Sequence, residues 1–158
     1  MFVSAYSSQQ WWSFIQNSRI QAGKWLEINT PKNSRVLAAD LGAITYYNPS
    51  NVIIDGAGLV NQSLLDVIEK SKSYSEYMQN SEIRFLVDGY SPNQPKAIEF
   101  RMNGLYVFYD PLKSRVYSTC SFEELFKLKE LKTFPENLSP DEEIVRYSIW
   151  EVTINKIC

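Results

Sequence analysis

Apolar residues recur at steps of three and four along residues 8–27, and this period predicts an amphipathic helix. The predicted buried stripe consists of Trp12, Ile15, Ala22 and Leu26, with the aliphatic stem of Arg19 between them. Pro31 disfavours helical geometry at the residue before it, so the helix should end by Thr30.

Two short apolar runs follow at residues 36–39 and 52–54, and each leads into an aspartate, Asp40 and Asp55. Short apolar runs of this kind predict strands that are covered on both faces. The residues between them, 41–47, have room for about two helical turns, which Asp40 could cap.

An amphipathic stripe at residues 59–70 predicts a second long helix. The resulting order of strand, short helix, strand and helix favours parallel pairing of the two strands. A third strand is predicted at residues 83–87.

The pattern changes in the second half of the chain. Two apolar segments flank Asn103-Gly104, the dipeptide that best forms a tight hairpin turn, so an antiparallel hairpin is predicted there. The remaining predictions are a strand at 116–120, a helix at 122–132, a surface loop at 133–143 and a final strand at 144–154.

These elements predict one α/β domain over residues 1–158, with a flexible start at residues 1–7. The sheet is expected to be mixed, with a parallel N-terminal part and an antiparallel hairpin in the C-terminal half. The helices at 8–27 and 59–70 should pack on it. A chain of 158 residues can bury a sizeable core without metal or disulfide support.

Composition excludes several functions. The formal net charge is −2 and both signs are scattered, so no basic stripe is available for nucleic acid. The chain has no histidine, which removes the usual general base of hydrolases and the commonest zinc ligand. We therefore expect no metal and no cofactor. No apolar run is long enough to span a membrane.

The two cysteines, Cys120 and Cys158, fit no metal spacing. They could be free thiols or one disulfide, and only their separation in space could decide between these states.

Asp40 and Asp55 are the first candidate site residues. If their strands are parallel neighbours, both carboxyl groups emerge at the sheet edge where open α/β folds bind ligands. Such a pair can divide acid and base roles. The favoured interpretation is that Asp40 caps a helix and Asp55 starts a glycine turn, since acidic residues are common at both positions.

The glycines near Asp55 resemble a nucleotide-binding loop only superficially. A dinucleotide fingerprint requires a third glycine where Asn61 stands, and Ala57 replaces the first glycine of the methyltransferase pattern. We assign structural turns to Gly42, Gly56 and Gly58.

Aromatic residues offer a third candidate, because sugar rings stack on flat aromatic faces. The possible platform consists of Trp11, Trp12, Tyr46, Tyr47 and Trp150. Burial in the core is the commoner fate of aromatic residues in a chain of this size.

Residues 19–61 resemble the soluble extracytoplasmic C-terminal region of GT-C membrane glycosyltransferases, which are polyprenyl-phosphate-sugar-dependent mannosyl- and arabinofuranosyltransferase-like proteins. The resemblance begins with Gly23-Lys24-Trp25-Leu26 at a helix end and a turn at Pro31. It continues through two strand ends, whose matching residues are Asp40, Gly42, Tyr46, Tyr47, Asp55, Gly58 and Leu59.

The resemblance implies an accessory domain that is not catalytic alone, because the catalytic acidic residue of that family lies in the transmembrane half. The chain would be a fragment of a larger membrane enzyme or a stand-alone relative. It would lie on the periplasmic face of a bacterial inner membrane, with the transmembrane part or a membrane protein as partner. That compartment would permit a disulfide between Cys120 and Cys158.

The expected role is to present a surface to a glycan acceptor, a lipid-linked sugar or a partner protein. Its expected ligand-binding residues are Asp40, Tyr46, Tyr47, Asp55 and Asn61. Two alternatives stay open. One is a small carboxylate-dependent enzyme that uses Asp40 and Asp55, and the other is a structural module with an exposed apolar patch.

Overall fold

The computed structural model describes residues 12–13, 15–38, 41–56, 61–63, 80–90, 126–135 and 146–155. Its helical elements are the π-helical segment η1 (Gln16–Ile20) and the α-helices α2 (Gln21–Asn29) and α3 (Leu41–Tyr46). Its strands are β1 (Arg35–Ala38), β2 (Val52–Asp55), β3 (Ile83–Tyr90), β4 (Phe126–Phe134) and β5 (Arg146–Ile154).

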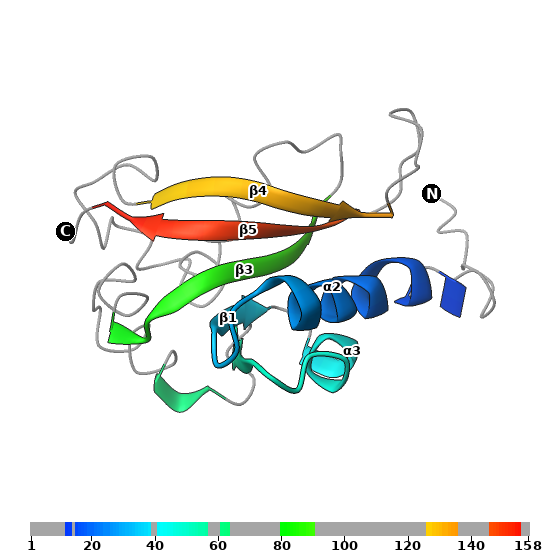
Figure 1. Cartoon of the computed structure of the whole chain (residues 1–158), viewed down its shortest axis with the longest axis horizontal. Helices are drawn as coiled ribbons and strands as arrows, with labels where there is room; N and C mark the ends of the chain where they lie inside the picture. Colours follow the sequence, from blue (N-terminus) through cyan, green and yellow to red (C-terminus); the bar gives the residue numbers. More distant parts are fainter. Residues whose placement is uncertain are drawn as a thin grey trace, which may run out of the picture.

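The strands form one mixed sheet in the order β2-β1-β3-β5-β4 (Figure 1). β1 runs parallel to both β2 and β3, whereas β5 runs antiparallel to both β3 and β4. The predicted α/β class is therefore confirmed, with the parallel part contributed by the N-terminal half. The antiparallel part described here is built by β3, β4 and β5. The hairpin predicted at Asn103-Gly104 lies outside the described residues, as does the strand at 116–120.

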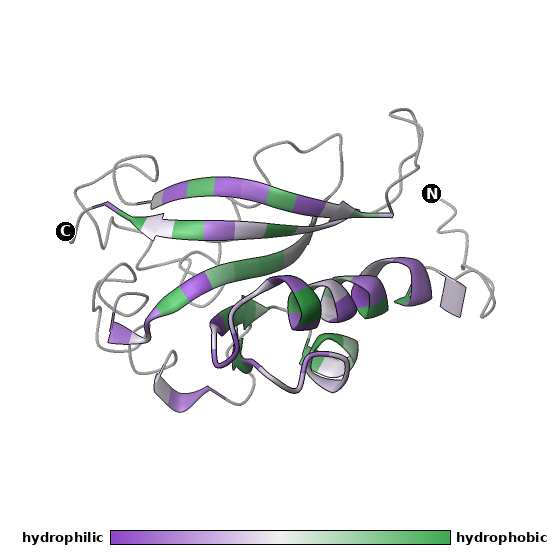
Figure 2. Ribbon diagram, in the orientation of Figure 1, coloured by the Kyte–Doolittle hydropathy of each residue, from purple (hydrophilic) through white to green (hydrophobic). Residues whose placement is uncertain are grey.

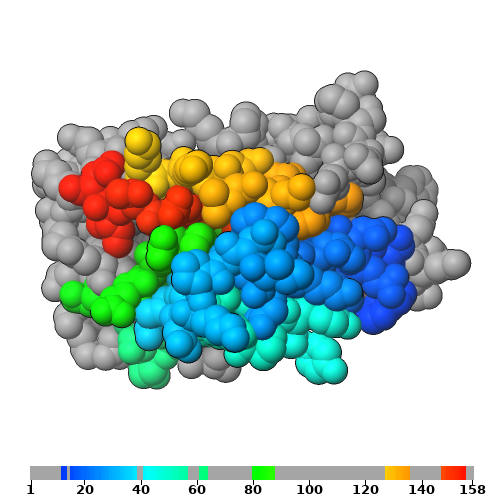
Figure 3. All heavy atoms as spheres, viewed as in Figure 1, coloured from blue at the N-terminus to red at the C-terminus, as the bar shows by residue number. Residues whose placement is uncertain are grey.

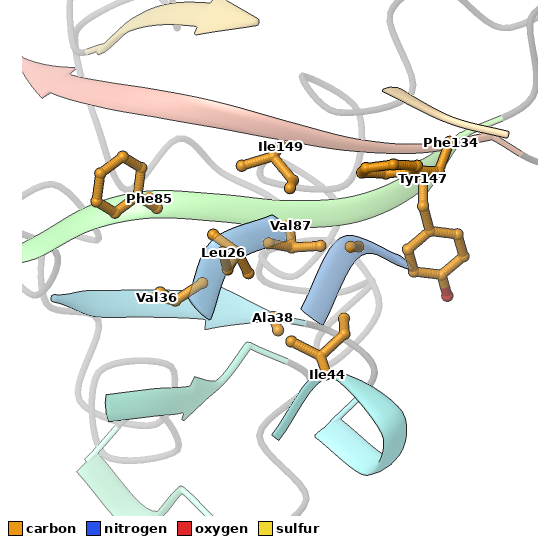
Figure 4. Packing of buried hydrophobic residues seen from close by; sticks show 10 residues of the cluster. Leu26, Val36, Ala38, Ile44, Phe85, Val87, Phe134, Tyr147 and Ile149 are labelled. Carbon is orange, nitrogen blue, oxygen red and sulfur yellow. The ribbon is translucent and has the colours of Figure 1, made fainter. Parts of the chain in front are cut away.

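The helices pack on one face of the sheet. In the space-filling view, the atoms of η1 and α2 lie across this face with α3 beside them (Figure 3). Leu26 of α2 is fully buried and points toward Val36, Val87 and Ile149 from three different strands (Figure 4). This face contains the hydrophobic core: Ala22, Leu26, Val36, Ala38, Ile44, Phe85, Val87, Phe134, Tyr147 and Ile149.

The other face of the sheet is also buried. The register places Leu37 beside Ile54 and Leu86, and Leu86 opposite Trp150. All four side chains are at most 8% exposed. Burial on both faces explains why β1 and the middle of β3 are apolar at consecutive positions, whereas β4 alternates (Figure 2). Trp150 thus belongs to the interior and not to a surface platform.

The first helix confirms part of the predicted stripe. Ala22 and Leu26 are fully buried, and the helix ends at Asn29 as expected, before the proline turn. Trp12, however, is 55% exposed, so its predicted burial is wrong. The reason is the π-helical turn of η1, which changes the spacing of the hydrogen-bonded turns and rotates the preceding residues out of line with α2. Ser18 and Ile20 are buried in this segment instead.

Arg19 keeps its predicted place beside the core. Its Nε donates a hydrogen bond to the hydroxyl of Tyr147 at 2.9 Å, and its guanidinium lies 5.3 Å from the centre of the Tyr147 ring. The contact ties η1 to β5, which is distant in the sequence.

The helix predicted at 122–132 is wrong where the structure describes it, because residues 126–134 form strand β4. β4 pairs with β5 along its length, and a register shift between Glu130 and Lys132 interrupts the alternation. At this shift Leu131 packs against the core. Leu128, Leu131 and Phe134 are consequently three residues apart in the sequence, a spacing that is also typical of a helix. Residues 133 and 134, which were predicted to open the loop, belong to β4, and residues 136–143 of that prediction lie outside the described residues.

The other predicted elements have mixed outcomes. The short helix at 41–47 and the strands at 36–39, 52–54, 83–87 and 144–154 are confirmed, with small changes of bounds. The helix predicted at 59–70 falls almost entirely outside the described residues.

Gly23 permits the close approach of α2 and α3. A Cβ atom at this position would lie 3.1 Å from both the carbonyl oxygen of Ile44 and the Cβ of Tyr47. Contacts this short require the neighbours to move, so the absence of a side chain fixes the separation of the two helices.

We expect Leu26→Ala to lower the free energy of unfolding by about 2–5 kcal/mol, because the side chain fills the centre of the core. Ile28→Ala on the same helix is the matched control. Ile28 is 80% exposed, and its truncation should change stability by less than about 0.5 kcal/mol. Urea unfolding of both variants, followed by circular dichroism, tests this. Equal losses would contradict the assigned face of α2.

Gly23→Ala should be destabilising by about 1–3 kcal/mol, although alanine is the better helix former, because the added methyl group overlaps α3. Gly42 is also helical but exposed, so Gly42→Ala should be neutral or stabilising by up to about 1 kcal/mol. In thermal unfolding, the midpoint temperature of Gly23→Ala should therefore fall, while that of Gly42→Ala should stay the same or rise. A stabilised Gly23→Ala variant would show that the helices are not in close contact.

Candidate functional site

An open pocket of about 410 Å³ lies beside β2. The described apolar residues among those that line it are Leu41, Ile53 and Ile54. Its polar lining consists of Arg35, Asp55, Asn61, Gln62, Ser63 and Ser81. The pocket thus combines a small apolar surface with side chains that donate and accept hydrogen bonds.

Gly56 directly follows Asp55, a lining residue at the end of β2. The N–H of Gly56 donates to the carbonyl of Ala38 at 2.9 Å, which continues the pairing of β1 and β2 by one residue. A Cβ at Gly56 would lie 3.1 Å from Cγ of Leu37, so the chain passes close to β1 at this point. The lack of a side chain at Gly56 permits this close approach.

Asn61 lies next to the end of β2. Its Nδ2 donates a hydrogen bond to the backbone carbonyl of Asp55 at 3.0 Å. Asp55 itself is 4% exposed, and the register places it opposite Ala38. Two residues predicted to bind a ligand, Asp55 and Asn61, are thus brought together at the carboxyl end of β2.

Arg35 contributes a cation to the pocket from the start of β1. It pairs with Val52, three residues before Asp55 on the neighbouring strand. Its Nε donates a hydrogen bond to the carbonyl of Ser81, which holds the guanidinium against the chain entering β3.

A polar cluster fixes the start of β2 and therefore the position of the pocket. The carboxylate of Glu27 on α2 accepts hydrogen bonds from both the N–H and the hydroxyl of Ser50, the former at 2.9 Å. Because both carboxylate oxygens are used, Glu27 joins the end of α2 to the loop before β2.

Asn51 forms the second half of this cluster. Its Nδ2 donates to the hydroxyl of Thr30 and to Oδ1 of Asn48, both at 2.8 Å, and its Oδ1 accepts the N–H of Ser34 at 2.9 Å. One amide therefore connects the helix end, the proline turn and the loop that leads into β2.

The two predicted tyrosines form a separate surface. Tyr46 is 77% exposed and meets the ring of Tyr47 edge to face, with ring centres 5.0 Å apart. Nζ of Lys24 lies 5.3 Å from the centre of the Tyr47 ring. Neither tyrosine is among the residues that line the pocket. The predicted ligand-binding residues consequently fall into two groups.

Several predicted residues cannot be placed. Asp40, Gly58, Trp11, Cys120 and Cys158 lie outside the described residues. The separation of Asp40 and Asp55, on which the enzyme alternative depends, is thus not described. Gly42, predicted to be in a turn, lies within α3.

Sequence reasoning missed Arg35 and Ser81. Arg35 precedes an apolar run and resembles an ordinary polar strand boundary, and Ser81 joins it only through the pairing of β1 with β3. Gln62 and Ser63 were also missed, although their proximity to Asn61 was a usable signal.

No group of three or more acidic or cysteine side chains within the described ranges could hold a metal ion. No helix among the described residues is long and apolar enough to cross a membrane.

A family model described as "Domain of unknown function (DUF8728)" matches residues 9–145, which is most of the chain. The chain belongs to this family. The matched region of the DUF8728 domain includes all the described residues that line the pocket. A comparison with curated proteins gave no match.

The Glu27–Ser50 contact predicts a dependence of stability on pH. Hydrogen bonds from the hydroxyl and then the N–H of Ser50, with a smaller effect of Lys32, lower the pKa of Glu27 below its usual 4.5. The ionised carboxylate therefore stabilises the fold above the unfolded-state pKa, and this contribution is lost as pH falls through the lower native pKa.

Glu27→Gln should thus be less stable than the wild type at neutral pH, and the difference should shrink as the pH falls below about 4.5. Urea unfolding over a pH series measures this difference. Glu82→Gln, at an exposed position, controls for the loss of a negative charge alone. A difference that stays constant down to about pH 3 would contradict the role of the ionised carboxylate.

Proposed function

We propose that the DUF8728 domain is a non-catalytic carbohydrate-binding module and that a sugar occupies the pocket beside β2. The observation that supports this proposal is the lining itself. Among the described residues, six with hydrogen-bonding groups and three apolar ones line the pocket, and they include Asp55 and Asn61, which the sequence had already suggested as ligand-binding residues.

The chemistry of the lining suits a polyhydroxylated ligand. Each sugar hydroxyl both donates and accepts hydrogen bonds, so it can pair with carboxylate, amide, hydroxyl and guanidinium groups alike. Sugar rings also present C–H groups, which can lie on Leu41, Ile53 and Ile54. A volume of about 410 Å³ falls in the range of small-molecule pockets and accommodates one or two sugar rings.

The resemblance of residues 19–61 supports a cellular setting for this activity. In that setting the domain would be an accessory part of a GT-C membrane glycosyltransferase, on the periplasmic side of a bacterial inner membrane. It would hold a glycan acceptor or a lipid-linked sugar near the membrane-embedded catalytic centre. Its partner would be the transmembrane part of the enzyme.

Titration of the isotope-labelled domain with a panel of monosaccharides and short glycans, followed by NMR, tests the proposal. We expect chemical-shift changes centred on Asp55, Asn61 and Ser63. Asn61→Ala should weaken binding by about tenfold, because one or more hydrogen bonds to the ligand and the support of Asp55 are lost. Asn17→Ala is the matched control, since Asn17 is exposed on η1 and distant from the lining.

The tyrosine surface provides an internal comparison. Because Tyr46 does not line the pocket, Tyr46→Ala should leave sugar binding within about twofold of the wild type. A large loss in this variant, with Asn61→Ala unaffected, would transfer the site to the tyrosines. Absence of shifts across the whole panel would refute the carbohydrate proposal.

A further inference from the structure

We infer that the sugar held beside β2 carries an anionic group and that Arg35 binds this group. The inference rests on the proposed function, because it concerns the same pocket. It adds a property of the ligand, its charge, and a recognition residue that sequence analysis did not select.

The hydrogen bonding of Arg35 leaves its outer edge available. Nε donates to the carbonyl of Ser81, which fixes the plane of the guanidinium. Among the described residues the guanidinium forms no ion pair within 4.0 Å, unlike that of Arg84, which lies 3.7 Å from a carboxylate oxygen of Glu151. The two Nη groups of Arg35 can therefore donate together to one carboxylate or phosphate. Such a bidentate contact is the geometry that arginine provides and lysine does not.

The register of the strands separates this cation from the acidic end of the pocket. Arg35 pairs with Val52, and Asp55 lies three residues further along β2. Three residues of strand correspond to about 10 Å between backbone positions. An anionic group can thus meet Arg35, while ring hydroxyls pair with Asn61, Gln62 and Ser63 of the same pocket.

Charge balance favours an anion over a neutral ligand at Arg35. The guanidinium is half-buried, so it has lost part of its hydration, and the carbonyl of Ser81 compensates only one of its five N–H groups. A hydrogen bond between charged partners contributes about twice as much as a neutral one in such surroundings. The ligand class is therefore a uronic acid or a sugar phosphate, which share the oxyanion chemistry.

Isothermal titration of the wild-type domain with glucuronate and galacturonate tests the inference. Each is compared with its methyl ester, which has a similar shape but no charge, and with the neutral parent sugar. Glucose 6-phosphate and galactose 6-phosphate form the second arm. We expect at least one anionic sugar to bind about tenfold more tightly than its neutral counterpart at low salt. The preference should decrease as salt is added.

Arg35→Gln should remove this preference, so that the dissociation constants of the anionic and neutral sugars differ by less than about threefold. Arg35→Lys should retain the preference only in part. Arg84→Gln is the matched control, because Arg84 lies on the adjacent strand and does not line the pocket. Circular dichroism checks that the variants fold. If Arg35→Gln is unfolded, the comparison of acid and ester in the wild type still decides.

The outcomes separate this inference from the proposed function. Tighter binding of a uronate than of its ester supports the inference and assigns a carboxylate, and tighter binding of a sugar phosphate alone assigns a phosphate. Equal binding of charged and neutral sugars overturns the inference while the carbohydrate proposal stands. Failure of every sugar to bind overturns both.

Discussion

The parallel pairing of β1 with two neighbours is the constraint on which the rest of the structure depends. β1 is only four residues long, yet it lies between β2 and β3 and aligns both. Parallel strands cannot be joined by a tight turn, so the chain must cross a face of the sheet between them, and α3 fills that role between β1 and β2. The same register decides which side chains meet at the pocket. Arg35 and Asp55 lie at opposite ends of the paired segment of β1 and β2, and both line the pocket.

The position of the loop before β2 is determined by polar side chains at the C-terminal end of α2. The apolar contacts of α2 stop at Leu26, and from there hydrogen bonds of Glu27 and Thr30 continue the attachment to the loop before β2. Hydrogen bonds are directional, so this cluster sets the position of the loop more exactly than apolar packing could. The Nδ2 atom of Asn48, buried without a partner among the described residues, is the one imperfection of the cluster.

Elements whose formation depends on neighbouring residues in the sequence could be predicted from the sequence alone. The proline turn, the apolar runs at 36–39 and 52–54 and the short helix between them were predicted with nearly correct bounds. Prediction was wrong at β4, where a shift of register relative to β5 gives a helical spacing that only the partner strand explains. It was also wrong at Trp12, since a π-helical turn leaves no signature in the apolar pattern. For the pocket, Asp55 was selected because it ends an apolar run and Asn61 because it closes the segment that carries the resemblance, whereas Arg35 and Ser81 are united only by long-range pairing.

The irregularity in β4 also affects how this molecule behaves among its own copies. β4 is the last strand of the described sheet, and the end of a sheet is where another chain can add its own strand. Lys127 and Lys129 are exposed along it, and the extra residue near Glu130 bends the strand away from a regular ladder. Exposed charged residues and an irregular ladder are both features that disfavour the addition of a further strand. The residue spacing that misled the prediction of a helix thus coincides with the least regular part of this outer strand.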